Sequence, residues 1–143
     1  MQPPADSGPK RVVRGAVVKL LCHTRLDRGM RLEEFESRCV RAGEVHELVT
    51  TDQHDTAADT RIDRVGFLGF VELRCGGVID RADEVWVGGQ RIGAVLGFDG
   101  CHLPNHYNLL IASDHLLTGP SLGLEPEDEI RFVRPPPAQE ASG

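Results

Sequence analysis

The segment from Glu84 to Phe98 constrains the fold of this chain more than any other segment. Two adjacent glycines, Gly88 and Gly89, stand there between two stretches rich in β-branched and apolar residues. Glycine adopts the positive φ angles that a two-residue hairpin turn requires, so the segment predicts two antiparallel strands joined at positions 88 and 89. Alternate residues of the second strand are expected to point toward the core, namely Ile92, Ala94, Leu96 and Phe98.

Further short strands are expected on both sides of this hairpin. Apolar or β-branched segments, separated by glycine, proline or polar residues, occupy positions 12–21, 44–51, 65–73, 108–113 and 129–133, and positions 37–42 are ambiguous. The inward residues are expected to be Val65, Phe67, Val71 and Leu73 in one strand and Ile130 and Phe132 in another. Helix signals are weak. The sequence therefore predicts an all-β fold: a small closed or partly open β-barrel of short strands with little helix.

The domain organisation follows from length and from the composition of the ends. A chain of 143 residues has the length of one ordinary domain. Residues 1–10 and 134–143 are rich in proline and in small or polar residues, so we expect two disordered tails around a single domain at residues 11–133. The glycines of 66–69 and 97–100 lack the Lys-Ser/Thr of a phosphate loop and are expected to permit bulges or tight corners.

Composition narrows the class of function. The formal net charge is −6, which argues against a nucleic-acid binder. Lys10 and Lys19 are the only lysines, and this favours a coding bias toward arginine, with bidentate anion recognition as the functional alternative. No apolar run is long enough to span a bilayer, and the N-terminus lacks the apolar stretch of a signal peptide. The four cysteines are widely spaced, so we expect reduced thiols and a cytoplasmic protein.

The segment from Asp99 to Asn108 is the candidate site, because it concentrates side chains that bind or react. His102 and His106 are four residues apart, a spacing common among metal ligands on a helix. Pro104 disfavours helical geometry at the residue before it, so the two histidines are not expected to share an ordinary helix. With Pro104 as the first helical residue, His106 would lie in the first turn and His102 on the preceding loop, and such a stiff loop can still bring both imidazoles to one ion.

Three interpretations of this segment stay open. In the first, His102, His106 and Asp99 bind a divalent metal, Zn²⁺ or Fe²⁺, with open positions for substrate. In the second, no metal is bound, one histidine is a general acid or base oriented by Asp99 or by an asparagine amide, and Asn105 and Asn108 hold the loop or the substrate. In the third, the segment is a hydrogen-bonded loop with its histidines at the rim.

His46 is the next candidate. On a strand, His46 shares a face with Glu44 and Leu48, while Glu47 shares a face with Val45 and Val49. A surface strand with alternating polar residues is the commoner outcome of such a pattern, and the functional alternative is that His46 or Glu47 completes the site across the barrel. The three remaining histidines outside the segment, His23, His54 and His115, are expected to be exposed.

Two resemblances carry further expectations. The stretches 83–97, 108–111 and 124–132 resemble the glucitol/sorbitol-specific IIA component of the bacterial phosphotransferase system, and this resemblance implies a small β-barrel. No histidine occurs in residues 67–78, where that family carries its phosphorylated histidine. The stretch Phe98-Asp-Gly-Cys-His-Leu-Pro-Asn-His-Tyr-Asn108, of the form FDxxHxPNHxN, is similar to the signature of an uncharacterised bacterial family of small proteins, together with residues 64–70. That resemblance implies no activity.

The leading functional hypothesis is a barrel that binds a small polar molecule in a pocket beside the 99–108 loop, as a metal-assisted lyase, isomerase or hydrolase. In it, His102, His106 and Asp99 are ligands or acid–base groups, and Asn105, Asn108 and His46 contact substrate. The alternative is a non-enzymatic ligand-binding or regulatory module related to the IIA barrel that has lost phosphorylation. A third hypothesis is a subunit whose barrel serves oligomerisation, such as a homodimer. The expected partner is a small molecule, with no nucleic acid and no membrane.

Overall fold

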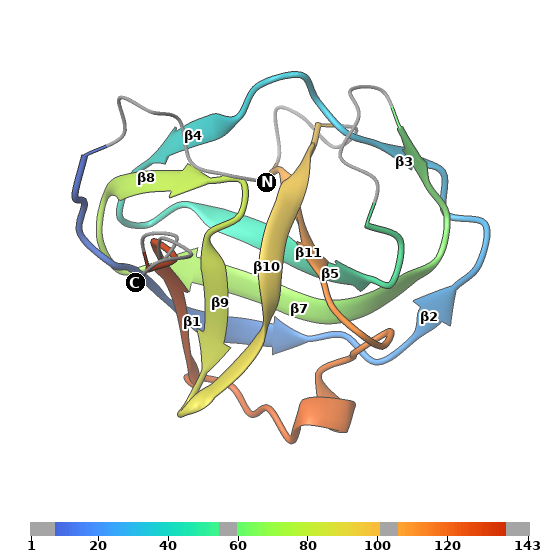
Figure 1. Cartoon of the computed structure of the whole chain (residues 1–143). Helices are drawn as coiled ribbons and strands as arrows, with labels where there is room; N and C mark the ends of the chain where they lie inside the picture. The colour runs from blue at the N-terminus through green and yellow to red at the C-terminus, as the bar shows by residue number, and fades with distance from the viewer. Residues whose placement is uncertain (1–7, 55–59, 101–105, 137–143) are drawn as a thin grey trace, which may run out of the picture.

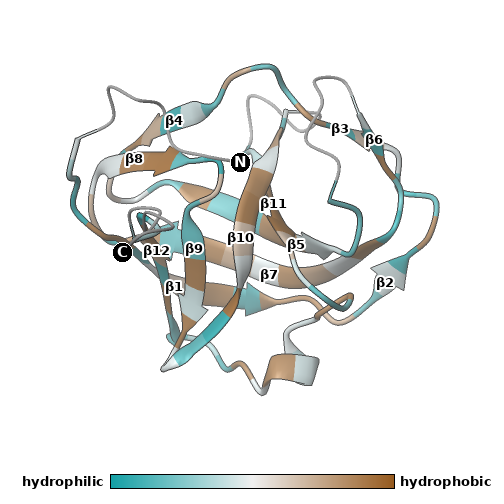
Figure 2. Ribbon diagram, in the orientation of Figure 1, coloured by the Kyte–Doolittle hydropathy of each residue, from teal (hydrophilic) through white to brown (hydrophobic). Residues whose placement is uncertain are grey.

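The computed structural model describes residues 8–54, 60–100 and 106–136, which fold into strands and a single 3₁₀ turn, η1 (Pro120–Leu122) (Figure 1). Figure 2 shows that apolar residues are concentrated on the strands, whereas the connecting segments are more hydrophilic. The prediction of an all-β fold with little helix is confirmed. None of the described helical residues forms a helix that is long and apolar enough to cross a membrane.

Seven strands of the main sheet pair into a ring. In order of pairing the strands are β1 (Val13–Leu20), β12 (Glu129–Val133), β9 (Glu84–Val87), β10 (Gln90–Asp99), β11 (Asn108–Ala112), β5 (Val45–Thr51) and β7 (Val65–Leu73). β7 also pairs with β1, which closes the ring, and β2 (Thr24–Arg25) extends the sheet beyond β7. The pairings are antiparallel except for that of β11 with β5, which is parallel.

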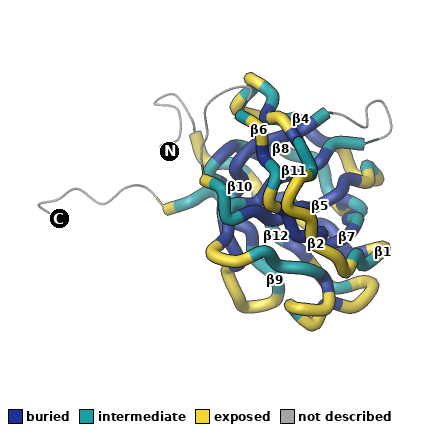
Figure 3. Tube along the Cα trace, turned by 90° about the vertical axis from the view of Figure 1, so that its right-hand side faces the viewer, coloured by how far each residue is buried: buried dark blue, intermediate teal, exposed yellow. Residues whose placement is uncertain are grey.

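Two short ribbons lie outside this ring. β3 (Met30–Arg31) pairs with β6 (Arg61–Ile62), and β4 (Ser37–Val40) pairs with β8 (Gly77–Asp80). The ambiguous segment 37–42 therefore contains a strand. Figure 3 shows that most of the ring is buried, while exposure is concentrated at the turns and in the segments around it.

The predicted hairpin is confirmed. Val87 at the end of β9 pairs with Gln90 at the start of β10, so Gly88 and Gly89 form the turn. Gly88 has φ = +58°, a conformation that a residue with a side chain rarely adopts.

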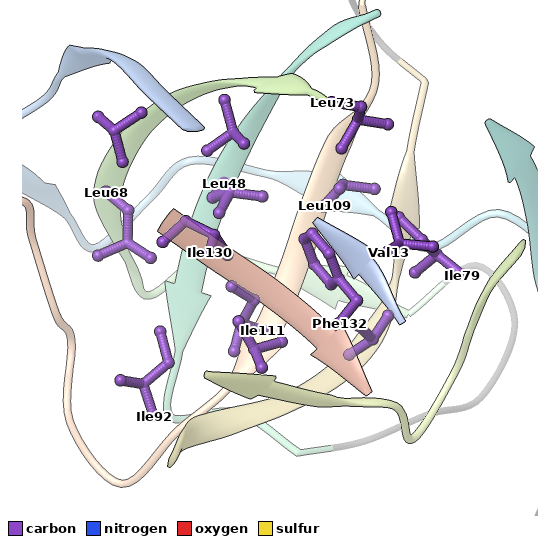
Figure 4. Close-up of a cluster of buried hydrophobic side chains, with 14 of the residues drawn as sticks. Val13, Leu48, Leu68, Leu73, Ile79, Ile92, Leu109, Ile111, Ile130 and Phe132 are labelled. Atoms are coloured by element: carbon purple, nitrogen blue, oxygen red, sulfur yellow. The ribbon is translucent and has the colours of Figure 1, made fainter. Parts of the chain in front are cut away.

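The larger hydrophobic cluster fills the inside of the ring (Figure 4). Ile130 and Phe132 of β12 are fully buried in it, as predicted, and they meet Leu48 of β5 and Leu109 of β11. Burial of this kind stabilises a fold by about 25 cal/mol for each Å² of apolar surface removed from water.

A second cluster packs on the outer face of β5, β7, β10 and β11. Val49 and Leu110 belong to this cluster, although their neighbours Leu48 and Leu109 belong to the inner one, because alternate residues of a strand point to opposite faces. The side chains that cover this outer face are Met30 of β3, Leu32 just after β3, and Ile62 of β6. The ring therefore has a hydrophobic layer on both faces of one wall.

This second layer corrects the predicted alternation in two strands. Val65 and Phe67 lie in the outer cluster, whereas Val71 and Leu73 lie in the inner one. Leu96 also lies in the outer cluster, and Ala94 is only half-buried. The reason is a shift of register within the pairings of β7 and β10, because a bulge inserts one residue and moves the following side chains to the other face.

Lys10 holds the segment before β1 against the β8 ribbon. Its ammonium group contacts the carboxylates of Asp80 and Asp83 and donates a hydrogen bond of 3.1 Å to the carbonyl of Val78. The division into two tails and one domain stays a prediction, since residues 1–7 and 137–143 lie outside the described part of the chain.

Candidate functional site

His46 and Glu47 stand next to each other on β5 and point to opposite faces of the ring wall. His46 follows the face of Leu48, which is in the inner cluster, and Glu47 follows the face of Val49, which is in the outer cluster. Both are buried, with 6% of their surface exposed. The two residues therefore belong to two different polar groups, and we describe these in turn.

The outer group is a row of side chains across four paired strands. Asp99 at the end of β10 pairs with Asn108 at the start of β11, Asn108 pairs with Glu47 of β5, and Glu47 pairs with Phe70 of β7. Residues paired in this way present their side chains on the same face. We call Asp99, Asn108 and Glu47 the outer polar row. Two of its members lie where β10 ends, at Asp99, and where β11 begins, at Asn108.

Asp99 is held from two sides. Its Oδ2 accepts a hydrogen bond of 2.8 Å from the backbone N–H of Arg31 in β3, and its Oδ1 accepts one of 3.1 Å from the side-chain amide of Asn108. Asp99 and Asn108 are buried, at 3% and 0% exposure. A buried carboxylate requires such donors to offset its loss of hydration. Asp99 thus ties the β3 segment to the ring and fixes the amide of Asn108.

His106 contacts the outer polar row at Glu47. Its Nε2 lies 3.4 Å from Glu47 Oε1, and the two side chains are only 10% and 9% exposed. The ring of Phe70 meets the imidazole edge-on, with 5.1 Å between the ring centroids. A carboxylate beside an imidazole orients the ring, which is the arrangement used in general acid–base catalysis.

The inner group joins His46 to Glu44 and to the backbone of Tyr107. His46 Nε2 lies 2.7 Å from Glu44 Oε1, and His46 Nδ1 accepts a 3.1 Å hydrogen bond from the N–H of Tyr107. Because Nδ1 is an acceptor, the ring proton resides on Nε2 and is donated to Glu44. His46 therefore holds the chain immediately before β11 against β5.

The Tyr107 ring is covered by two side chains of the segment that contains β4. The guanidinium carbon of Arg38 lies 3.8 Å from the centre of this ring, and Phe35 meets the ring edge-on at 6.0 Å. Phe35 also packs on Phe98 of the inner cluster, at 5.4 Å. The inner group is thus built into the packing at one end of the ring, which favours a structural role for His46.

The pKa of the Glu44 carboxyl lies below its usual value of 4.5. Burial alone would raise this pKa, but the hydrogen bonds from His46 and from the backbone N–H of Arg41, with the charge of Arg38, outweigh the burial. A carboxyl whose pKa is lower in the folded state stabilises the fold at neutral pH, and this contribution disappears as the pH falls through the folded-state pKa.

Glu44→Gln is therefore expected to destabilise the chain at pH 7 and to have a smaller effect as the pH falls below the usual carboxyl range. Urea unfolding of both proteins at a series of pH values measures this difference. Glu34→Gln, at an exposed position, is the matched control and should show no such trend. A difference for Glu44→Gln that does not vary with pH would contradict the assignment.

The structure places four of the six predicted site residues. It brings Asp99 and Asn108 together and puts His106 beside the same row, but it places His46 on the inner face, away from them. His102 and Asn105 lie outside the described residues. In the described part of the chain, no three His, Cys, Asp or Glu side chains are grouped closely enough to hold a metal ion. His23, His54 and His115 are exposed, as predicted.

Some residues of this region were not assigned roles from sequence. Glu47 was considered only as an alternative to His46, and the contacts of Phe70, Tyr107 and the Arg31 backbone were not foreseen. The alternation of residues along β5 could have assigned Glu47 to the outer face. The Arg31 contact depends on where the β3 segment folds back, and no local pattern carries that information.

Comparison with known proteins assigns the chain to a protein family. No significant match was found among curated proteins or among solved structures. A family model described as a family of unknown function (DUF6917) matches residues 7–133, which include every strand and the whole segment from Asp99 to Asn108. The chain therefore belongs to this family of unknown function, DUF6917.

Proposed function

We propose that this protein binds a small polar molecule on the outer face of the ring, at the outer polar row, and that His106 exchanges a proton with it. The observation that supports the proposal is the nearly buried His106–Glu47 pair, with 3.4 Å between Nε2 and Oε1. A protein rarely buries an imidazole and a carboxylate together at a strand end for packing alone, since both lose hydration. The reaction classes that suit one oriented imidazole are those of a lyase, an isomerase or a hydrolase.

Each residue of the outer polar row has a different role in this proposal. Glu47 orients the imidazole of His106. Asn108 is fully buried, and its amide donates to Asp99, so it holds the start of β11 against the end of β10. Asp99 is a positioning residue, because both of its oxygens already accept hydrogen bonds.

A metal-assisted form of the same proposal adds a divalent ion, Zn²⁺ or Fe²⁺. In this form, His106 and His102 supply imidazole nitrogens, and Asp99 supplies a carboxylate oxygen, in the ligand set typical of open catalytic sites. Titration of Zn²⁺ by calorimetry tests this form. It requires stoichiometric binding that is lost in both His102→Ala and His106→Ala and retained in His115→Ala.

Ligand binding is tested by thermal stabilisation with a panel of small polar compounds. A ligand at about 100 times its Kd should stabilise the native protein by about 2.7 kcal/mol. We expect His106→Ala and Glu47→Gln to lose this stabilisation, whereas His115→Ala, at an exposed histidine, should retain it. Equal stabilisation of all these variants would show that the ligand binds elsewhere and would overturn the proposal.

The alternative is a non-enzymatic ligand-binding or regulatory module, as the resemblance to the glucitol/sorbitol-specific IIA component implies. The hydrogen bonds that Asp99 accepts from Asn108 and from the backbone of β3 tie these elements together, and this structural role is compatible with the alternative. It requires ligand-induced stabilisation that survives alanine at both His102 and His106. The same panel of compounds therefore separates the two functions.

A further inference from the structure

A second row of side chains crosses the opposite wall of the ring. Arg14 of β1 pairs with Arg131 of β12, Arg131 pairs with Trp86 of β9, and Trp86 pairs with Arg91 of β10. We call these four residues the Trp86 row. Neighbouring strands lie about 4.8 Å apart, so the row covers about 14 Å from Arg14 to Arg91. β12, β9 and β10, which carry three of the four residues, lie side by side in Figure 2.

The row faces solvent. The residues next to its members in the chain point into the inner cluster: Val13, Val85, Ile92, Ile130 and Phe132. Alternation along each strand therefore turns the row outward. Arg14 is exposed, and the side chains of Arg91 and Arg131 are 48% and 35% exposed. The row is also distant from the outer polar row, because Arg91 and Asp99 stand near opposite ends of β10, about 26 Å apart.

Trp86 is held in a defined orientation at the centre of this row. Its indole N–H donates a 3.1 Å hydrogen bond to Glu84 Oε1, and the guanidinium carbon of Arg131 lies 5.9 Å from the centre of its ring. Glu84, Trp86, Arg131 and Val133 line a hollow of about 280 Å³. A hollow with an oriented indole in its lining offers a flat apolar surface for another planar ring.

The charge of the row is positive in a chain whose net charge is −6. Glu84 lies 3.4 Å from Arg91, and Glu129 lies 3.7 Å from Arg131, so two carboxylates accompany three guanidinium groups. Within the part of the chain that the structure describes, Arg14 forms no ion pair. A guanidinium beside an aromatic ring is the combination that proteins use for anions with a planar body.

We propose that the Trp86 row binds a planar aromatic ring that carries a phosphate or a carboxylate. The ring stacks on Trp86 within the hollow, and the anionic group meets the guanidinium groups of Arg131 and Arg14. A single tryptophan provides a stacking surface for one ring, and the net charge of −6 opposes a long polyanion, so the occupant is a small molecule.

The sequence provides a direct readout, because Trp86 is the only tryptophan in the chain. We would titrate the full chain with AMP, which combines a ring with phosphate, and with nicotinate, which combines a ring with carboxylate, and follow the fluorescence of Trp86. Adenosine supplies a ring without charge, and inorganic phosphate supplies charge without a ring. We expect saturable quenching by AMP or nicotinate, with adenosine and phosphate at least about tenfold weaker. Which of the two anions binds identifies the anionic group.

Variants then test the assigned residues. Arg131→Gln and Arg14→Gln should each weaken binding of the active probe about tenfold, and added salt should weaken it further. Arg25→Gln, at an exposed arginine paired with Asp27 on another part of the surface, is the matched control and should bind like the native chain. No saturable binding of AMP or nicotinate at millimolar concentration would overturn the proposal. So would binding unaffected in both arginine variants, or stronger binding of a thymidine oligonucleotide than of either small probe.

Discussion

Gly69→Ala is expected to lower the free energy of unfolding by about 3 kcal/mol, which corresponds to a fall in Tm of about 10 °C for a domain of this size. Two costs combine at this position. Gly69 has φ = +150°, a conformation that residues with a side chain rarely adopt, at about 1–2 kcal/mol. A Cβ there would also lie 2.3 Å from the carbonyl oxygen of Lys19 on the neighbouring strand β1, so that β1 and β7 would have to separate.

Two other glycines separate these costs. Gly43 has φ = +93° but nothing within 4 Å of an added Cβ, so Gly43→Ala should show the conformational cost alone, about 1 kcal/mol. Gly89 has neither a positive φ nor a close neighbour, and Gly89→Ala should be nearly neutral. Urea unfolding of the three variants should rank them in this order. If Gly69→Ala were no worse than Gly43→Ala, the close approach of β1 to Gly69 would be wrong.

The conformation at Gly69 also matters for the proposed site. Leu68 and Val71 are three residues apart, yet both lie in the inner cluster, because the irregularity at Gly69 shifts the alternation. The same shift places Phe70 beside Glu47 on the outer face, where it contacts His106. Gly69→Ala should therefore also weaken ligand binding at the outer polar row, in addition to its effect on stability.

Asp99→Ala is expected to have the second large effect, a loss of about 3–4 kcal/mol in the free energy of unfolding. Asp99 is 3% exposed, and it accepts hydrogen bonds from the Arg31 backbone and from Asn108. A hydrogen bond to a charged group contributes about 1.5–3 kcal/mol, and its removal leaves buried donors without their acceptor. Both bonds join separate elements, so the β3 segment should loosen from the ring. Urea unfolding at neutral pH measures the loss.

Two further variants sharpen this test. Asp99→Asn keeps the size of the side chain but replaces one acceptor oxygen by a donor amide, so it should lose one of the two hydrogen bonds and an intermediate amount of stability. Asp27→Ala removes a carboxylate that is 83% exposed and should be nearly neutral. A neutral Asp99→Ala would contradict the positioning role and would favour a role as metal ligand or base, whose loss changes function rather than stability.

Local patterns in the sequence were sufficient to predict most of the strands. Val65–Leu73 and Glu129–Val133 have the predicted bounds, and the hairpin turns at Gly88 and Gly89. These segments are short, apolar and bounded by turn residues, so propensity and alternation agree with the fold. The errors, at Leu96 and at Val65 and Phe67, arise where bulges interrupt the alternation.

The chemistry of the candidate site was only partly visible in the sequence. Asp99, His106 and Asn108 were predicted from their density in one segment, and the structure places all three along the outer face. The partner of His106 is Glu47, which is 59 residues away in the chain. One partner of Asp99 is the backbone N–H of Arg31, whose position depends on the return of β3 over the ring. Spacing along a chain carries no information about contacts between residues so far apart in the sequence.

The sequence by itself determined the all-β class, the hairpin and the residues available for chemistry, because these depend on neighbours within a few positions. The tertiary structure alone decided that the proposed site lies on the outside of the ring, that His46 and Glu47 serve different faces, and that three arginines and one tryptophan form a row. The physical reason is register. The Trp86 row depends on the alignment of β1, β12, β9 and β10, and the outer polar row depends on the alignment of β10, β11, β5 and β7. Bulges and long-range packing set these alignments.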